Sequence, residues 1–264
     1  MQPETQFPDL RISALISVGK HPGSGRARRA EQDARAVEMG LQLAPQGLEV
    51  LHAGDPHEES LRAYAGMGLA QLRIIQQDEN ADVVPALSQY LSSAAPDLVL
   101  TGVRAESGES SGMVPYLLGE ALGWPVVTRI AEILRIENGQ AEVLQALPRG
   151  QRRLLKVALP FVASVDMAAA APRQSAFGPA SRAELAAQAA ATEQRDEVKA
   201  GWQEAPARKR PKRLKVVKAK TAADRFKAAT AKSSGGGGKV LRDKPAREMA
   251  QAVFDLLLEE GVLR

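Results

Sequence analysis

The residues best suited to chemistry are small and polar, and they follow an apolar run near the middle of the chain. The run Asp97–Gly102 leads into Val103–Gly112, in which Ser110 and Ser111 stand among glycines. Glycines let backbone N–H groups approach an anion, and the start of a following helix adds its dipole. The segment therefore predicts a phosphate-binding loop. The alternative is an ordinary surface loop in which Ser110 caps the next helix.

Two further loops follow predicted strands. Gly19–Gly25 follows the first strand and Ala53–Pro56 the second. Loops after parallel strands meet at one edge of a sheet, so the three together favour a ligand pocket at that edge. His21 could act as a general base there. No carboxylate or nucleophile stands at a matching spacing, however, and this favours a solvated loop histidine.

Several kinds of chemistry have no matching motif. The chain has no cysteine and only three histidines, so we expect no disulfide, no thiolate site and no metal centre. It also has no Walker sequence, no dinucleotide fingerprint, no Ser-His-Asp arrangement and no pair of catalytic carboxylates. We therefore predict no catalytic residues, and a carrier or regulator rather than a hydrolase. The lack of cysteine, of a signal peptide and of a long apolar stretch favours the cytoplasm without membrane insertion.

The first half of the chain alternates short apolar runs with amphipathic segments of about twelve residues, which predicts an α/β fold with a parallel, doubly wound sheet. Strands are expected at 11–18, 48–54, 71–75 and 97–102, and helices at 30–43, 58–68, 83–94 and 110–122.

The pattern changes after Pro125. Two turn signals, Glu137–Gly139 and Pro148–Gly150, separate alternating runs and predict an antiparallel meander added to the sheet. Residues 159–166 should return to the sheet as its last strand. An alanine-rich helix is expected over 181–194, with Ser181 as its N-cap.

Charge is divided unevenly along the chain. Residues 208–264 carry 16 basic and 6 acidic side chains, whereas acidic residues are in excess before them. The run 208–220 is basic and 233–238 reads as a flexible linker. An amphipathic helix is expected at about 245–260. Such a tail fits an arm that needs a partner surface. Nucleic acid is the weaker alternative, because no aromatic residue interleaves the basic run.

The segment 97–125 gives the most specific part of a resemblance to a known protein family that extends over most of the chain. Its D-L-V-L-x-G strand, Ala105 and the ending Leu122–Pro125 are similar to a strand, loop and helix of electron-transfer flavoprotein β subunits. Other matching pieces occur in the same order as in that family, namely Arg11–Val18, Asp33–Glu38, Leu159–Val162, Asp166, Pro172–Arg173, Arg213–Val216 and Glu259–Val262.

The resemblance implies a division of the chain and a set of contacts. Residues 1–184 would form an adenine-nucleotide-binding domain with a docking loop at 174–184, residues 185–205 a helix and connector, and residues 206–264 an arm that packs on a partner subunit. AMP would be bound by this chain, and FAD chiefly by the partner α subunit. The implied cofactor-binding residues are Ser17, Ala53, Gly102, Ala105, Glu109, Ser110, Ser111, Gly112 and Met113.

The family also implies an activity. The chain would be a non-enzymatic β subunit that accepts electrons from a flavin dehydrogenase and passes them to a membrane quinone oxidoreductase of the respiratory chain. Phe177 occupies the position of the apolar anchor in the docking loop, and the family's lysines are missing around it. This departure predicts a different or more specialised dehydrogenase. The alternative is a stand-alone nucleotide-binding module resembling a universal stress protein.

Overall fold

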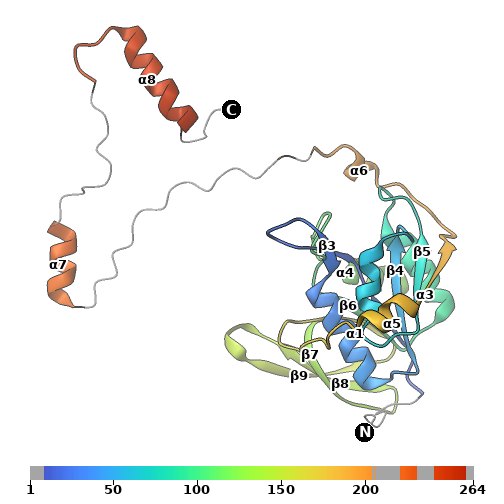
Figure 1. Ribbon diagram of the computed structural model, residues 1–264. Helices are drawn as coiled ribbons and strands as arrows, with labels where there is room; N and C mark the ends of the chain where they lie inside the picture. The colour runs from blue at the N-terminus through green and yellow to red at the C-terminus, as the bar shows by residue number, and fades with distance from the viewer. Residues whose placement is uncertain (1–8, 204, 206–220, 231–240, 260–264) are drawn as a thin grey trace. The chain divides into compact units, whose positions relative to one another are not determined.

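A computed structural model of the chain describes residues 9–203, 205, 221–230 and 241–259. The chain divides into two units, Met1–Trp202 and Gln203–Arg264 (Figure 1). The strands of the first unit are β1 Ile12–Leu15, β2 Val18–Lys20, β3 Ala27–Arg29, β4 Leu48–Gly54, β5 Gln71–Gln76, β6 Leu98–Gly102, β7 Val126–Glu137, β8 Gln140–Ala146, β9 Arg152–Ala158, β10 Phe161–Val165 and β11 Glu184–Ala189. Its helices are α1 Glu31–Leu43, η1 Glu59–Leu61, α2 Arg62–Ala65, α3 Val83–Ala94, α4 Val114–Leu122, η2 Pro148–Gly150, α5 Phe177–Arg182 and α6 Glu197–Ala200.

Nine of the strands form one sheet in the order β11-β5-β4-β1-β6-β10-β7-β8-β9. Every neighbouring pair from β11 to β7 is parallel, and the pairs β7–β8 and β8–β9 are antiparallel. The predicted parallel sheet with an added meander is confirmed. The strand order turns back at β1, with β4 on one side and β6 on the other, which is the switch point where such sheets bind ligands.

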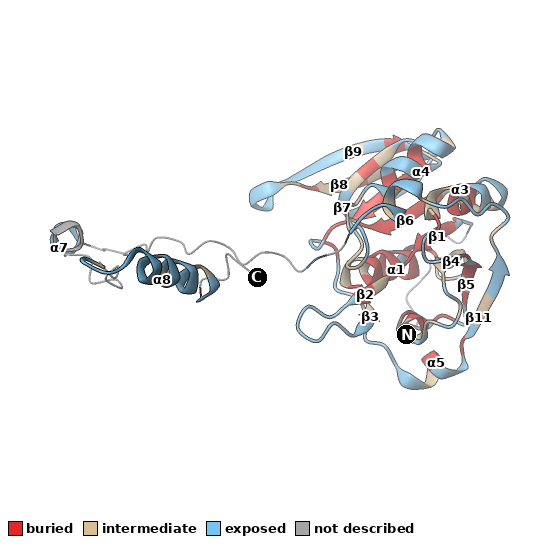
Figure 2. Ribbon diagram, turned by 90° about the horizontal axis from the view of Figure 1, so that it is seen from above, coloured by how far each residue is buried: buried red, intermediate tan, exposed pale blue. Residues whose placement is uncertain are grey.

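Helices cover both faces of the parallel part, as a doubly wound fold requires. Leu98 and Leu100 of β6 pack in a cluster with α1 and α2, whereas Val99 between them packs with α3 and α4 on the other face. The strand is buried throughout, which explains its continuous apolar sequence. Figure 2 shows the buried residues concentrated on these central strands and on the helix faces toward them.

The antiparallel meander forms at the two predicted turns. Glu137 pairs with Gln140, so Asn138 and Gly139 make a two-residue hairpin loop. Both have positive φ, 51° and 72°, which is the conformation that the Asn-Gly pair favours. The predicted last strand, 159–166, is observed as β10 and is inserted between β6 and β7.

The helix predicted over 181–194 is wrong; within 185–205 the structure has most of the strand β11 and the short helix α6. A short helix, α5, ends at Arg182, and residues 184–189 form β11, which runs parallel to β5 in six paired positions. Alanine favours a helix only by tenths of a kcal/mol per residue over most alternatives. Pairing with the otherwise open edge of β5, together with packing of Leu185 on the core, outweighs that preference.

The chain after β11 lies along the segment that joins β5 to α3. The Asp82 backbone N–H donates to the Gln194 carbonyl at 2.7 Å, and Ala81 forms an antiparallel bridge with Arg195. Asp196 then caps the short helix α6, and the Lys199 ammonium donates to the Glu79 carbonyl at 3.0 Å. We call residues 190–202 the strap. It brings α6 to the carboxyl edge of the sheet.

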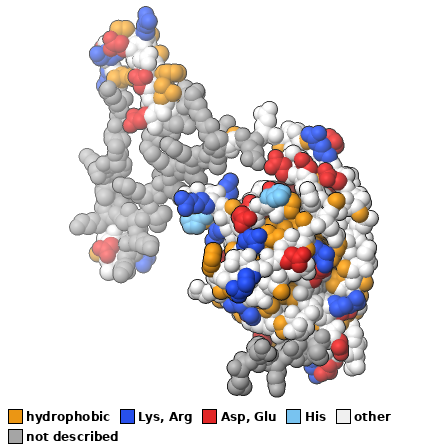
Figure 3. Space-filling model, turned by 45° about the vertical axis from the view of Figure 1, so that its right-hand side comes forward, with side chains coloured by type: hydrophobic (Ala, Val, Ile, Leu, Met, Phe, Trp, Pro, Cys, Tyr) orange, Lys and Arg blue, Asp and Glu red, His pale blue; other side chains and the backbone are white. Residues whose placement is uncertain are grey.

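The second unit contains two helices among its described residues, α7 Ala222–Thr230 and α8 Ala246–Glu259. The predicted C-terminal helix is confirmed as α8. Most of its large apolar side chains are exposed, with Val253 57% and Leu256 54% exposed; in Figure 3, apolar side chains of α8, at the top, lie among charged ones. The basic run 208–220 and the linker 233–238 lie outside the described residues.

Candidate ligand-binding site

A cavity of about 490 Å³ opens at the carboxyl ends of β1, β4 and β6. All nine residues predicted to bind a cofactor line it, namely Ser17, Ala53, Gly102, Ala105, Glu109, Ser110, Ser111, Gly112 and Met113. Residues outside that prediction complete the wall, among them Leu15, Asp33, His52, Val83, Leu87, Thr101, Arg104, Leu117, Asp196 and Lys199. The volume and the mixed lining suit a ligand with one apolar and one polar end.

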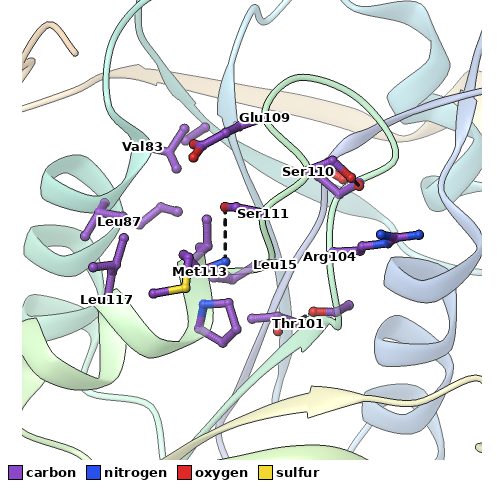
Figure 4. Close-up of a pocket in the computed structure, with 18 of the residues that line it drawn as sticks. Leu15, Val83, Leu87, Thr101, Arg104, Glu109, Ser110, Ser111, Met113 and Leu117 are labelled. Carbon is purple, nitrogen blue, oxygen red and sulfur yellow. Dashed lines mark hydrogen bonds between the residues drawn. The ribbon is translucent and has the colours of Figure 1, made fainter. Parts of the chain in front are cut away.

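The loop between β6 and α4 supplies the polar end. Gly108, Ser110 and Gly112 all have positive φ, so the backbone coils tightly before α4. The Ser110 hydroxyl donates to the Ala105 carbonyl at 2.6 Å and cannot also donate to a ligand. The Ser111 hydroxyl oxygen accepts the Met113 N–H at 3.3 Å, which leaves its own hydrogen available (Figure 4).

The helix that follows begins later than predicted. α4 starts at Val114 with Met113 at its N-cap, so Ser110 is not the N-cap. No side chain among residues 9–203 caps α4, whereas the Asp82 carboxylate caps α3 by accepting the Val84 N–H. An anion is favoured at an uncapped helix N-terminus and repelled where a carboxylate already stands. The two helix starts that face the cavity therefore differ, and the α4 end suits a phosphate.

Glu106 holds this loop against the rest of the domain. Its carboxylate accepts the Lys20 and Glu31 backbone N–H groups, each at 3.1 Å, and two N–H groups of the Arg28 guanidinium at 3.0 and 3.1 Å. Since Ala30 provides no side-chain cap, Glu106 satisfies the first turn of α1 from a distant part of the chain. The Ser107 hydroxyl adds a bond to the Val18 carbonyl at 2.6 Å.

Replacing Glu106 by alanine is expected to loosen the loop 103–112. The change removes four hydrogen bonds to one carboxylate and leaves the Arg28 guanidinium without its partner, a loss of about 2 kcal/mol. Hydrogen exchange followed by mass spectrometry should show faster exchange at 103–112 and at the start of α1. Glu109→Ala is the matched control, because Glu109 is exposed in the same loop. Equal protection in the two variants would contradict this role of Glu106.

Asp33 lies at the floor of the cavity and is only 4% exposed. Its carboxylate accepts the Ser17 backbone N–H at 2.8 Å and the Ser17 hydroxyl at 2.5 Å. Burial raises the pKa of Asp33 to about 6, although the hydrogen bonds from Ser17 and from the Gly102 backbone act in the opposite direction. A Cβ at Gly102 would overlap this carboxyl group. Glycine is therefore required at the end of β6.

One wall of the cavity is apolar. Val83 and Leu87 of α3 lie together with Leu117 of α4 on one side of the space in Figure 4, and Arg104 lies on the other. His52 of β4 and Asp82, which precedes α3, are further polar residues of the lining. The strap adds Asp196 and Lys199 to the lining.

Part of the predicted pocket is wrong. The loop Gly19–Gly25 forms a separate hairpin between β2 and β3 and contributes nothing to the lining of the cavity. His21 is exposed in that turn, where its Nδ1 accepts the Gly23 and Ser24 N–H groups at 3.2 and 3.1 Å. This geometry agrees with a solvated loop histidine that orders its own turn.

Sequence reasoning missed several lining residues. His52 could have been identified, because it stands near the carboxyl end of a predicted parallel strand. Asp33 belongs to the matching piece Asp33–Glu38, but nothing in that motif indicates that its side chain reaches the cavity. Asp196 and Lys199 could not have been placed, because the strap depends on β11, which the sequence predicted as helix.

Two features are absent from the described residues. No group of three or more potential metal ligands comes together there. In the same part of the chain, no helix has both the length and the apolar character that crossing a bilayer requires.

The fold and the cavity define a class: a doubly wound α/β domain with a ligand cavity at the switch point of its sheet. Comparison with known proteins narrows this class. A family model for the electron transfer flavoprotein domain matches residues 26–200. The electron transfer flavoprotein subunit beta of Chromohalobacter salexigens is 53% identical over 268 residues, covering 100% of both chains. This chain therefore belongs to the β-subunit family of electron transfer flavoproteins.

Proposed function

We propose that this chain is the β subunit of a heterodimeric electron carrier and that its cavity holds AMP. The observation that supports the nucleotide most directly is the uncapped start of α4 together with the coiled loop before it, in a cavity that also has an apolar wall. Backbone N–H groups and the Ser111 hydroxyl would bind the phosphate. The apolar wall would pack on the base.

FAD would be held mainly by the α subunit, with this chain covering one side of it. Electrons would pass by tunnelling between bound cofactors. No proton donor or acceptor is then required of this chain, which agrees with the lack of a catalytic motif. AMP would act as a structural ligand that joins the loop, α4 and the strap. The arm 206–264 would pack on the α subunit.

The electron donor would be a flavin dehydrogenase, and the acceptor a quinone oxidoreductase at the membrane, with the carrier itself in the cytoplasm. Phe177 supports a docking role, because it is 88% exposed at the start of α5. A large apolar side chain at this exposure is a common anchor in interfaces. A stand-alone regulator resembling a universal stress protein is not favoured, because the match to a β subunit runs through the arm as well as the domain.

The nucleotide proposal is tested by comparing AMP with adenosine. Calorimetric titration of the nucleotide-depleted heterodimer should show AMP binding at least about 100-fold more tightly, because charged hydrogen bonds contribute roughly 1.5–3 kcal/mol each. Ser111→Ala should weaken AMP binding about 10-fold and leave adenosine unchanged. Equal affinities for the two ligands, or no binding of either, would refute the phosphate site.

A further inference from the structure

A second cavity, of about 450 Å³, shares part of its wall with the first. Both are lined by the loop that precedes α4, through Arg104, Ser111, Gly112 and Met113. The rest of the second cavity is lined by Val103, Tyr116 of α4, Thr128 and Arg129 of β7 and Ser164 of β10. No carboxylate belongs to this lining among the described residues. Every polar side chain in it carries a hydrogen that it can donate, so the cavity suits an anion.

A β-bulge in β7 presents Arg129 to the second cavity. The pairing of β7 with β10 shifts here, so that two residues of β7, Thr128 and Arg129, face Ser164 alone. Arg129 has a φ of 57°, a left-handed conformation that is unfavourable for a residue other than glycine. The Ser164 hydroxyl oxygen stabilises it by accepting the Arg129 backbone N–H at 2.9 Å. Bulges redirect side chains in this way and are frequent beside functional sites.

The guanidinium of Arg129 is oriented by a buried carboxylate that leaves two of its nitrogens free. Its Nε donates to Oδ2 of Asp166 at 2.8 Å, and Oδ1 of Asp166 accepts the Ala168 N–H at 2.9 Å. Both carboxylate oxygens are therefore already bonded. Neither Nη1 nor Nη2 of Arg129 forms a hydrogen bond with the described part of the chain, so both remain available to a ligand.

A second guanidinium lines the same cavity without a partner. The Arg104 backbone N–H donates to Oε1 of Gln32 at 3.2 Å, but the side chain makes no hydrogen bond or ion pair within residues 9–203. It points away from the apolar wall of the first cavity in Figure 4. Positive groups that line one cavity repel each other, and an anion between them removes that cost.

We propose that the second cavity binds a phosphate group, held by the guanidinium groups of Arg104 and Arg129 and by the Tyr116 hydroxyl. The planar guanidinium matches two phosphate oxygens at once, which an ammonium group cannot do. The site is distinct from the proposed AMP site, because Arg129 and Tyr116 line the second cavity alone. Val103 and Met113 supply an apolar flank that suits the organic part of a phosphate ester.

Calorimetric titration of inorganic phosphate into the AMP-saturated heterodimer tests the site, because AMP then fills the first cavity. One phosphate should bind per heterodimer. Arg104→Gln should weaken phosphate binding at least about 10-fold by removing a charged donor. Tyr116→Phe removes one hydroxyl and should weaken it about 3- to 10-fold. Arg153→Gln is the matched control, because Arg153 is equally exposed and lines neither cavity; it should bind phosphate like the wild type.

Arg129→Lys separates the two cavities. The lysine keeps the charge beside Asp166 but cannot also present two nitrogens to a ligand, so phosphate should bind at least about 10-fold more weakly. Arg104→Gln and Tyr116→Phe change exposed side chains, so they decide the matter even if Arg129→Lys fails to fold.

The outcomes also distinguish this proposal from the AMP site. No phosphate binding in the presence of AMP, or equal phosphate affinity in Arg104→Gln, Tyr116→Phe and Arg153→Gln, would overturn the second site and leave the AMP proposal intact. If AMP itself does not bind, the titration is made without it. A phosphate that Tyr116→Phe weakens then lies in the second cavity, whereas one that is indifferent to this change does not.

Discussion

Replacing Val253 and Leu256 together by glutamate is expected to separate this chain from the α subunit. The two side chains are three residues apart on α8 and follow Met249 at helical spacing, so the three share one face. A 14-residue helix is marginal in water by itself. Its exposed apolar face therefore needs a surface, and we propose that the α subunit provides it.

The expected size of this effect follows from the buried area. Each aliphatic side chain contributes roughly 1.5–3 kcal/mol when it is fully buried. Losing both should weaken the heterodimer at least about 100-fold, and the introduced charges would weaken it further. Sedimentation of the two co-expressed subunits measures this directly. Gln251→Lys, on the opposite side of α8, is the control and should leave the complex intact. A stable heterodimer with both glutamates would show that α8 does not contribute to the interface.

Replacing Asp33 by asparagine is expected to change how stability depends on pH. The pKa of Asp33 is about 6 in the folded chain and about 3.9 in an unfolded one. The folded state therefore favours the protonated carboxyl group. Stability from this group is fully present below pH 4 and is lost as pH rises through 6. The loss is about 3 kcal/mol, because each unit of pKa difference corresponds to 1.36 kcal/mol.

Urea unfolding of the full-length chain between pH 4 and pH 7 measures the effect. The free energy of unfolding of Asp33→Asn relative to wild type should rise by about 2 kcal/mol over this range, because asparagine does not titrate. Comparing the two proteins at each pH cancels the contribution of the other ionisable groups. Asp255→Asn is the control, since this exposed carboxyl group loses little solvation on folding. A constant difference between wild type and Asp33→Asn would contradict the burial of an uncompensated carboxyl group.

A second buried carboxyl group responds in the opposite direction. Glu38 accepts two N–H groups of the Arg173 guanidinium at 2.7 and 3.0 Å. Burial alone would raise the pKa of Glu38, but the hydrogen bonds and charge of Arg173 outweigh it and lower the pKa. Its stabilisation is present at neutral pH and is lost as pH falls. The pKa values of Glu38 and Asp33 shift in opposite directions because the positive charge of Arg173 faces Glu38, whereas only neutral hydrogen-bond donors face Asp33.

The sheet could be predicted because its central strands are buried on both faces and read as continuous apolar runs. Asp97–Gly102 is the clearest case, and the Asn138–Gly139 turn marks the meander equally well. β11 could not be predicted, because its alanines favour a helix locally and only the open edge of β5 makes them a strand. The same failure concealed the strap, and with it Asp196 and Lys199.

The cavity was predicted better than its chemistry. Loops at the carboxyl ends of parallel strands meet at one place, so residues from β1, β4 and β6 could be grouped before their geometry was known. The sequence could not predict which of the two neighbouring serine hydroxyls is free to donate a hydrogen bond to a ligand. Ser110 and Ser111 are adjacent and alike, yet the first is committed to Ala105 and the second is not. Ser110 also has a positive φ, a conformation that no sequence pattern specifies.

Co-expression of this chain with its α subunit, followed by chemical analysis of the purified complex, tests the central claim most directly. The expected result is a yellow heterodimer that releases FAD and AMP in equal amounts on denaturation. A heterodimer with FAD but no AMP would refute the nucleotide site in this chain. A folded, colourless chain that purifies alone, without any flavin-bearing partner, would contradict the account as a whole.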